Sequence, residues 1–277
     1  MSMGVGLTIP NISNLPGVSR PGSGVQTDKY SLNFRTNESS QVRYTNQTIT
    51  NGSSMNLWFR YTGNPLATGL LNAGVVLVGH TTSPYASVQL RRKTVDGENR
   101  ILIRLSVQSP SGQENKDYIS TNILNSTDWW NLSISYGPFL MRSEAEIDVY
   151  INGVKLTVDD EDTWTVNPQY SAFGNNRTNS TVSGFQGQIT QFAQFGPVPN
   201  TILTAAQALA IYNNGKPTDL SSYNPTIWYE LKEGPGANYQ DQNYLANSGS
   251  LTNVNSTISE PGNFDTNFDG NFTENFD

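Results

Sequence analysis

Three side chains in this sequence are candidates for acid-base chemistry. Glu146 and Asp148 are separated by one residue. Alternate residues of a β-strand share a face, so both carboxylates are predicted to project from the same side of a strand. His80 is the only histidine, and it lies in a segment, residues 78–82, that is typical of a strand end entering a turn. A Ser-His-Asp triad needs its histidine beside a nucleophile, so we predict a structural or surface role for His80.

A cluster of cations is the first candidate for a binding site. One predicted hairpin of this otherwise acidic chain carries the residues Arg91, Arg92, Lys93, Arg100 and Arg104. Two hypotheses fit such a cluster. It is either a solvated strand face, or a patch that contacts an acidic partner surface or an anionic glycan.

Aromatic side chains are the second candidate, because sugar-binding surfaces combine exposed rings with amide and carboxylate groups. The strand around Trp58 alternates Leu57 and Phe59 with Trp58 and Arg60, which predicts that Trp58 faces away from the core. We therefore group Trp58 with the basic cluster as a candidate ligand or partner site. The aromatic candidates for such a sugar-binding surface are Trp58, Tyr61, Trp129 and Trp164.

The two ends of the chain differ in composition from its middle. Residues 1–26 are interrupted by glycine and proline so often that we predict an extended N-terminal arm. Residues 259–277 repeat Asn-Phe with a period of four, at Phe264, Phe268, Phe272 and Phe276. Such a segment cannot bury enough apolar surface by itself. It is either a solvated acidic tail or a peptide whose four rings dock on a partner or a neighbouring copy.

The overall composition excludes several classes of protein. The 277 residues include no cysteine, so there are no disulfides, thiolate metal sites or cysteine nucleophiles. The net charge of −7 argues against nucleic-acid binding, which needs clustered Lys and Arg. No apolar run approaches the ~20 residues of a membrane span. Residues 1–23 lack the basic and apolar regions of a signal peptide, which predicts a soluble product of the cytosol.

The middle of the chain reads as short strands separated by turns, which predicts an all-β antiparallel sandwich. Asp96-Gly97 and Asn152-Gly153 each join two alternating runs, so we predict a hairpin at both. The residues predicted to be buried are Trp130, Leu132, Ile134, Ile147, Val149 and Ile151.

One helix is predicted, over residues 204–213. Thr204 and Gln207 have the spacing of a capping box, and Gly215 suits the left-handed position after a helix. Pro217 prevents the helix from continuing. This helix is expected to cover one edge of the sandwich.

Five phrases follow one another in a characteristic order over about residues 28–255. They are Tyr30–Phe34, Asn56–Arg60, Trp130–Tyr136 with Ile147–Gly153, Phe185–Phe192 with residues 203–215, and Ile227–Leu231 with Asn247–Asn253. Together they resemble the laminin-G-like or concanavalin A-like jelly-roll family, especially members found in bacteriophage and viral proteins. The resemblance implies a two-sheet antiparallel jelly roll with one short helix, in a domain of residues 27–258 between the arm and the tail.

The sequence departs from this family at positions that would bear on metal binding. Some members hold calcium with an Asp-Glu pair, and here Thr190 and Gln191 take its place. Neutral side chains are poor ligands for calcium, so we predict no metal and no cofactor there. The acidic run of residues 159–162 is either a solvated loop or a separate metal site.

Glucanases built on the same jelly roll carry a strand that reads Glu-x-Asp-x-Glu. Here the last position is Tyr150, so the second carboxylic acid that retaining glycosidases need is missing. We therefore predict that Glu146 and Asp148 are strand residues on a solvent face, and that the protein is not an enzyme.

The resemblance to viral proteins and the two unusual ends together predict a virion structural protein. We expect a capsid-associated decoration or head-fibre protein of a tailed phage, assembled in the host cytoplasm. Its partners would be other virion proteins or further copies in a homo-oligomer. The alternative is a tail-fibre or adhesin lectin that recognises host surface glycans.

Overall fold

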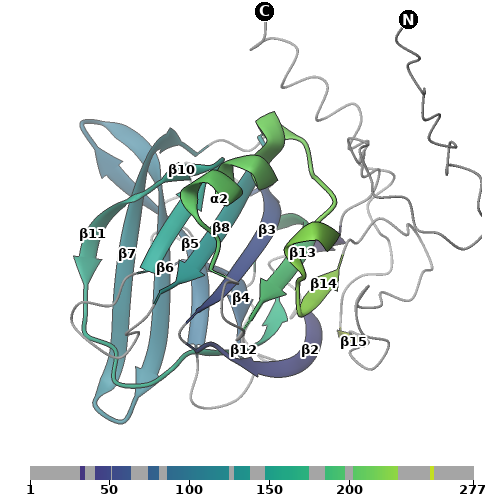
Figure 1. Ribbon diagram of the computed structural model, residues 1–277. Helices are drawn as coiled ribbons and strands as arrows, with labels where there is room; N and C mark the ends of the chain where they lie inside the picture. The colour runs from purple at the N-terminus through teal and green to yellow at the C-terminus, as the bar shows by residue number, and fades with distance from the viewer. Residues whose placement is uncertain are drawn as a thin grey trace, which may run out of the picture.

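The computed structural model describes ten stretches of the chain: residues 32–34, 41–50, 52–63, 74–80, 86–124, 128–137, 147–174, 185–196, 202–229 and 250–252. These residues form two antiparallel sheets packed face to face (Figure 1). The predicted all-β antiparallel sandwich is therefore confirmed. The predicted N-terminal arm, the C-terminal tail with Phe264, Phe268, Phe272 and Phe276, and Glu146 lie outside the described residues.

The first sheet, sheet A, has seven strands within the described residues, in the order β1-β13-β3-β8-β9-β10, with β14 paired to β13. They are β1 (Leu32–Phe34), β3 (Ser53–Tyr61), β8 (Trp130–Tyr136), β9 (Ile147–Ile151), β10 (Val154–Lys155), β13 (Gly187–Phe195) and β14 (Ile227–Tyr229).

The second sheet, sheet B, has eight strands within the same residues, in the order β11-β7-β6-β5-β4-β12-β2-β15. They are β2 (Gln41–Thr48), β4 (Val75–Gly79), β5 (Ala86–Val95), β6 (Glu98–Ser109), β7 (Gly112–Ile123), β11 (Thr157–Glu161), β12 (Gln169–Phe173) and β15 (Ser250–Thr252).

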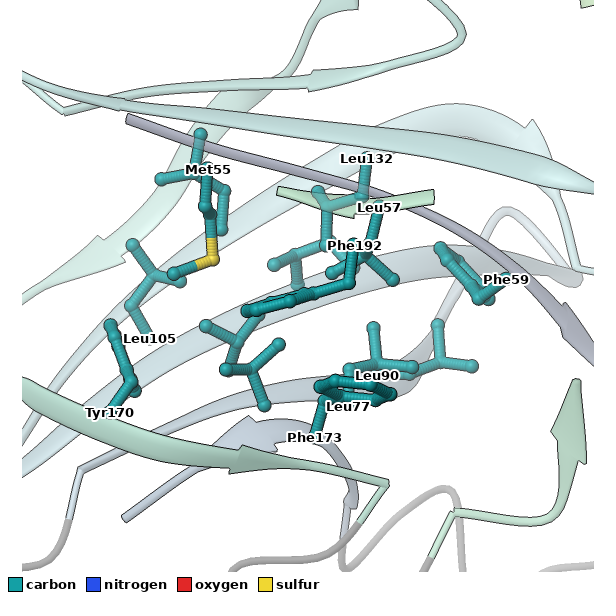
Figure 2. Close-up of a cluster of buried hydrophobic side chains, with 14 of the residues drawn as sticks. Met55, Leu57, Phe59, Leu77, Leu90, Leu105, Leu132, Tyr170, Phe173 and Phe192 are labelled. Atoms are coloured by element: carbon teal, nitrogen blue, oxygen red, sulfur yellow. The ribbon is translucent and has the colours of Figure 1, made fainter. Parts of the chain in front are cut away.

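The core lies between the two sheets. Alternate residues of each strand point into it, because successive side chains of a strand face opposite sides of the sheet. Figure 2 shows Phe192 of β13 beside Phe173 of β12, with leucines from both sheets around them. All six residues predicted to be buried are buried: Trp130, Leu132, Ile134, Ile147, Val149 and Ile151.

Both predicted hairpin turns are confirmed by their backbone angles. Asp96 and Gly97 have φ of 53° and 84°, and Asn152 and Gly153 have φ of 52° and 74°. Two successive positive φ values match the right-handed twist of the flanking strands. The first turn joins β5 to β6, and the second joins β9 to β10.

The predicted helix is α2 (Ala205–Tyr212), and its capping box between Thr204 and Gln207 is present. Its C-terminal end differs from the prediction. Asn213 takes the left-handed position with φ 44°, because asparagine tolerates that region, whereas Gly215 ends the short 3₁₀ turn η2 (Asn213–Gly215). A second 3₁₀ turn, η3 (Ser221–Tyr223), precedes β14. In the part of the chain that is described, no helix has the length and apolar character to cross a membrane.

Candidate binding site

The outer face of sheet A is covered by the chain that runs from α2 to β14. Leu203, Ile211 and Leu220 pack there against Ala193, Phe195 and Trp228, residues of β13 and β14. Figure 1 shows α2 lying across the front of this sheet. A ligand therefore has no direct access to this central part of sheet A.

The same cover explains why Trp58 and Trp129 are not exposed, because both pack with Tyr212. Tyr61 and Trp164 instead belong to the core between the sheets. Trp58 does face away from the core, as its alternation predicted, but it is 1% exposed and stacks on Tyr212 of α2. Tyr61, Trp129 and Trp164 are also buried. None of these rings can stack on a sugar in this structure, so Trp58 does not belong to a surface site.

The outer face of sheet B carries an ordered group of polar side chains over β5, β6 and β7. Strand register places them in two rows of directly opposed residues. We call these six residues the polar grid: Ser87, Ser106 and Asn115 in one row, and Gln89, Arg104 and Asp117 in the other. They alternate along the strands with inward-facing residues such as Val88, Leu105 and Tyr118.

The centre of the grid is an ion pair between neighbouring strands. Nε and Nη2 of Arg104 donate to the two oxygens of Asp117 over 2.7 and 2.6 Å. This two-point bond fixes the plane of the guanidinium group as well as its position. The bond to Asp117 raises the pKa of Arg104 and outweighs the effect of partial burial. Asp117 is only 4% exposed, so Arg104 is the outer member of the pair.

Two glutamine side chains are held in the same way. Nε2 of Gln89 donates to Oγ of Ser87 over 2.8 Å. Nε2 of Gln113, an exposed residue at the start of β7, donates to Ser106 over 2.8 Å and to Asn115 over 3.1 Å. Ser87 and Ser106 are 4% and 5% exposed. Each outer planar group therefore rests on a smaller, nearly buried polar partner.

These bonds leave hydrogen-bonding capacity on the solvent side of the grid. Within the described residues, the bonds of Arg104 use Nε and Nη2 and leave both N–H groups of Nη1. Asn115 accepts a bond at Oδ1, which leaves its Nδ2 donors, and Gln113 donates from Nε2, which leaves its Oε1 acceptor. The grid thus offers both donors and acceptors in fixed positions.

The structure divides the predicted basic patch between two faces. Arg91, Lys93, Arg100 and Arg104 share the outer face of sheet B, whereas Arg92 lies opposite Ile101 on the inner side. Lys93 pairs with Asp159 at 2.5 Å and Arg100 pairs with Glu98 at 3.4 Å. Burial and the nearby charge of Arg104 lower the pKa of Arg91, although Asp117 acts against this. The role of the patch in binding remains a prediction.

The acid-base candidates have structural partners. Asp148 accepts a bond from the hydroxyl of Tyr150 at 3.0 Å and pairs with Lys155 at 2.5 Å. Nδ1 of His80 lies 2.9 Å from Oγ of Ser171, and burial lowers the pKa of His80. Asp148 is a partly exposed residue between two buried neighbours of β9, as expected for a solvent-face strand residue, and the contact of His80 with Ser171 agrees with a structural role.

Three of the four acidic residues, Asp159, Asp160 and Glu161, lie in a strand and not in the predicted loop, whereas Asp162 follows the strand; all four are exposed, as predicted. Residues Thr157–Glu161 form β11, the edge strand beside β7. Asp159 pairs with Lys93, Glu161 pairs with Lys116, and Asp162 accepts a bond from the backbone N–H of Asn115. Among the described residues, no three Asp, Glu or His side chains gather where they could hold a metal ion.

Of the six grid residues, only Arg104 was predicted from the sequence to belong to a binding site. Ser87, Gln89, Ser106, Asn115 and Asp117 are ordinary polar residues at alternating positions of three predicted strands. Alternation alone indicates that they face outward. The turn at Asp96-Gly97 sets the register between β5 and β6, and this register places Gln89 opposite Arg104. The turn was therefore the feature of the sequence from which this neighbour of Arg104 could be predicted.

Comparison with known proteins adds to this picture. No family model matches the chain, and no curated protein matches it by sequence. A putative carbohydrate binding protein from Bacteroides ovatus ATCC 8483 is similar in structure, at 14% identity and a TM-score of 0.50 over 80% of this chain and 58% of that protein. This chain thus spans little more than half of its length.

A second solved structure is similar along its whole length. The heptameric SAP-like pentraxin from Limulus polyphemus is 10% identical, and the match covers 86% of this chain and 100% of the pentraxin, with a TM-score of 0.50. This chain has a jelly-roll fold. The two-sheet antiparallel jelly roll implied by the sequence is therefore confirmed, whereas membership of the laminin-G-like or concanavalin A-like family and the association with viral proteins remain predictions.

Proposed function

We propose that this protein binds a glycan without transforming it, and that the polar grid on sheet B is its binding site. The observation that carries this proposal is a fixed layer of planar side chains on a face that no described element covers: Gln89 and Arg104 of the grid, and the adjacent Gln113 bonded to it. The central part of the other broad face of the sandwich is covered by α2 and the segment that follows it.

The chemistry of the grid suits sugar hydroxyls. A hydroxyl group both donates and accepts hydrogen bonds, and the grid presents guanidinium and amide donors beside amide acceptors. These groups are already held by Asp117, Ser87 and Ser106, so little side-chain entropy is lost when a ligand binds. The grid covers about 10 Å across the strands and about 7 Å along them, a size suited to a short stretch of oligosaccharide.

Comparison with solved structures supports the choice of glycan over other ligands. A protein described as a putative carbohydrate binding protein has the same fold. Fold alone does not establish function, so the proposal depends on the grid itself. The missing second carboxylate at Tyr150 and the pairing of Asp148 with Lys155 support binding without hydrolysis.

Replacing Arg104 and Asp117 together is the direct test of the site. We expect Arg104→Met with Asp117→Leu to weaken glycan binding at least about tenfold, because the charge-assisted donors at the centre of the grid are lost. The fold should persist, since an apolar pair of similar volume replaces the whole ion pair. The measurement is a glycan array with the full chain, followed by calorimetry on the best ligand.

A matched ion pair on the other sheet provides the control. Lys155 pairs with Asp148 at 2.5 Å on sheet A, and its side chain is 59% exposed. Lys155→Ala should leave both glycan binding and the melting temperature nearly unchanged. Equal binding by the wild type and the Arg104 and Asp117 double variant would exclude the grid as the site.

A second test changes the grid without removing any polar group. Gly74 has φ of +90°, and a Cβ there would lie 2.5 Å from Oε1 of Gln89 and 3.3 Å from Cγ of Arg91. We expect Gly74→Ala to displace Gln89 from Ser87 and to weaken glycan binding several-fold. NMR chemical shifts of the Gln89 amide would report the displacement, and an unmoved amide with weakened binding would contradict this explanation.

A virion building block remains a separate prediction. Its motivating features, the N-terminal arm and the four phenylalanines of the tail, lie outside the described residues. A glycan-binding domain and a virion location are compatible, because a host-recognition protein of a phage would be both.

A further inference from the structure

One row of the polar grid continues onto the edge strand β11. Asp160 lies directly opposite Asp117, so the row runs Gln89, Arg104, Asp117, Asp160 across four strands. The next acid, Asp162, accepts a bond from the backbone N–H of Asn115 over 2.7 Å, which places it at the end of the other row. We call Asp160 and Asp162 the acidic rim of the grid.

The rim changes the electrostatic character of the site. Asp160 and Asp162 both act to raise the pKa of Arg104, so their fields reach the centre of the grid. Among the described residues at the grid, Arg91 and Arg104 contribute two positive charges, and Asp117 with the rim contributes three negative charges. Lys93 and Arg100, the other cations of this face, each have an acidic partner. The basic residues seen in the sequence therefore do not produce a basic surface here.

We propose that the acidic rim makes the grid selective for neutral glycans over glycans that carry carboxylate groups. This inference rests on the proposed function and specifies its ligand class. A carboxylate on the sugar would approach Asp160 and Asp162 without a net positive field to attract it, whereas hydroxyl groups carry no such penalty. Asp160 is the specificity-determining residue, because it is exposed and, among the described residues, its side chain accepts a bond only from the neighbouring backbone N–H of Glu161.

The test compares sugars that differ only in charge. The probes are neutral disaccharides of glucose, galactose and mannose, and the same disaccharides with a uronic acid in place of one residue, at low ionic strength. In each pair that the protein binds, we expect the neutral disaccharide to bind at least about fivefold more tightly than its uronic acid counterpart. Raising the salt to about 0.5 M should narrow this ratio, because salt screens exposed charges.

Charge substitutions identify the residue responsible. Asp160→Asn should improve binding of the uronic acid probe roughly two- to fivefold relative to binding of the neutral probe. Asp219→Asn is the matched control, because it changes the net charge of the protein by the same amount at a site away from the grid. Asp219 precedes the 3₁₀ turn that leads to β14 of sheet A, and its carboxylate accepts a bond from the backbone N–H of Ser221. Asp160→Ser serves as a second variant, and melting curves confirm that each protein is folded.

The outcomes separate this inference from the proposed function. Equal or tighter binding of the uronic acid probe by the wild type would overturn the selectivity and leave glycan binding intact. An identical ratio in Asp160→Asn and the wild type would overturn the role of Asp160. Failure of every glycan on the array to bind would overturn both proposals.

Discussion

Replacing Phe192 with alanine is expected to lower the free energy of unfolding by about 3–5 kcal/mol, the usual cost of deleting a buried aromatic ring. Phe192 has no exposed surface, and its ring stacks on Phe173 at a centroid distance of 4.7 Å (Figure 2). The centre of its ring also lies 5.2 Å from that of Tyr44. Phe192 belongs to sheet A and its two partners belong to sheet B. The substitution thus removes a contact between the sheets as well as apolar burial.

Thermal melting is the measurement, and a decrease on the order of 10 °C is expected for a chain of this size. Leu209→Ala is the control, since Leu209 lies on α2 and is 54% exposed. It should change stability by less than about 1 kcal/mol. Similar losses in the two variants would show that Phe192 does not join the sheets as described.

Replacing Glu161 with glutamine is expected to cost about 3 kcal/mol, whereas replacing its partner Lys116 with methionine should cost far less. Lys116 has no exposed surface, its ammonium group bonds to Glu161, and it lies 5.8 Å from the centre of the Trp164 ring. Glu161→Gln leaves a buried cation without its counter-charge. Lys116→Met keeps the packing on Trp164 and leaves a carboxylate that is 30% exposed and can be hydrated.

Denaturant unfolding of the two single variants and the double variant measures this asymmetry. The double variant Lys116→Met with Glu161→Gln should recover most of the stability lost in Glu161→Gln, because no buried charge then lacks a partner. Equal costs for the two single substitutions would contradict the assignment of Lys116 as the buried member of the pair.

This ion pair also connects the core to the proposed site. Lys116 lies between Asn115 and Asp117, two residues of the polar grid. Glu161 lies between Asp160 and Asp162, the two residues of the acidic rim. Because neighbouring residues of a strand face opposite sides, the pair beneath the sheet holds the rim in register with the grid above it. Glu161→Gln is therefore expected to reduce the selectivity for neutral glycans as well as stability.

Local features of the sequence determined the elements of this fold. Alternating apolar residues defined the strands and their buried faces, as in Trp130, Leu132 and Ile134. Paired Asp-Gly and Asn-Gly residues defined two hairpins, since these residues accept the positive φ that such turns require. The capping box at Thr204 defined the start of α2. These features depend on residues close in sequence, so they could be predicted without knowledge of long-range contacts.

Only the tertiary structure decided which surfaces are open and which residues meet there. Alternation showed that Trp58 faces away from the core, but the packing of α2, some 150 residues later in the chain, buries it. Composition indicated a basic hairpin, but the position of β11 beside β7 places Asp160 in line with Arg104 and reverses the local charge. Exposure and electrostatic field depend on long-range packing and strand register. Neither long-range packing nor strand register can be predicted from a short stretch of sequence, because the residues of one strand do not determine which strand or helix will lie against its outer face.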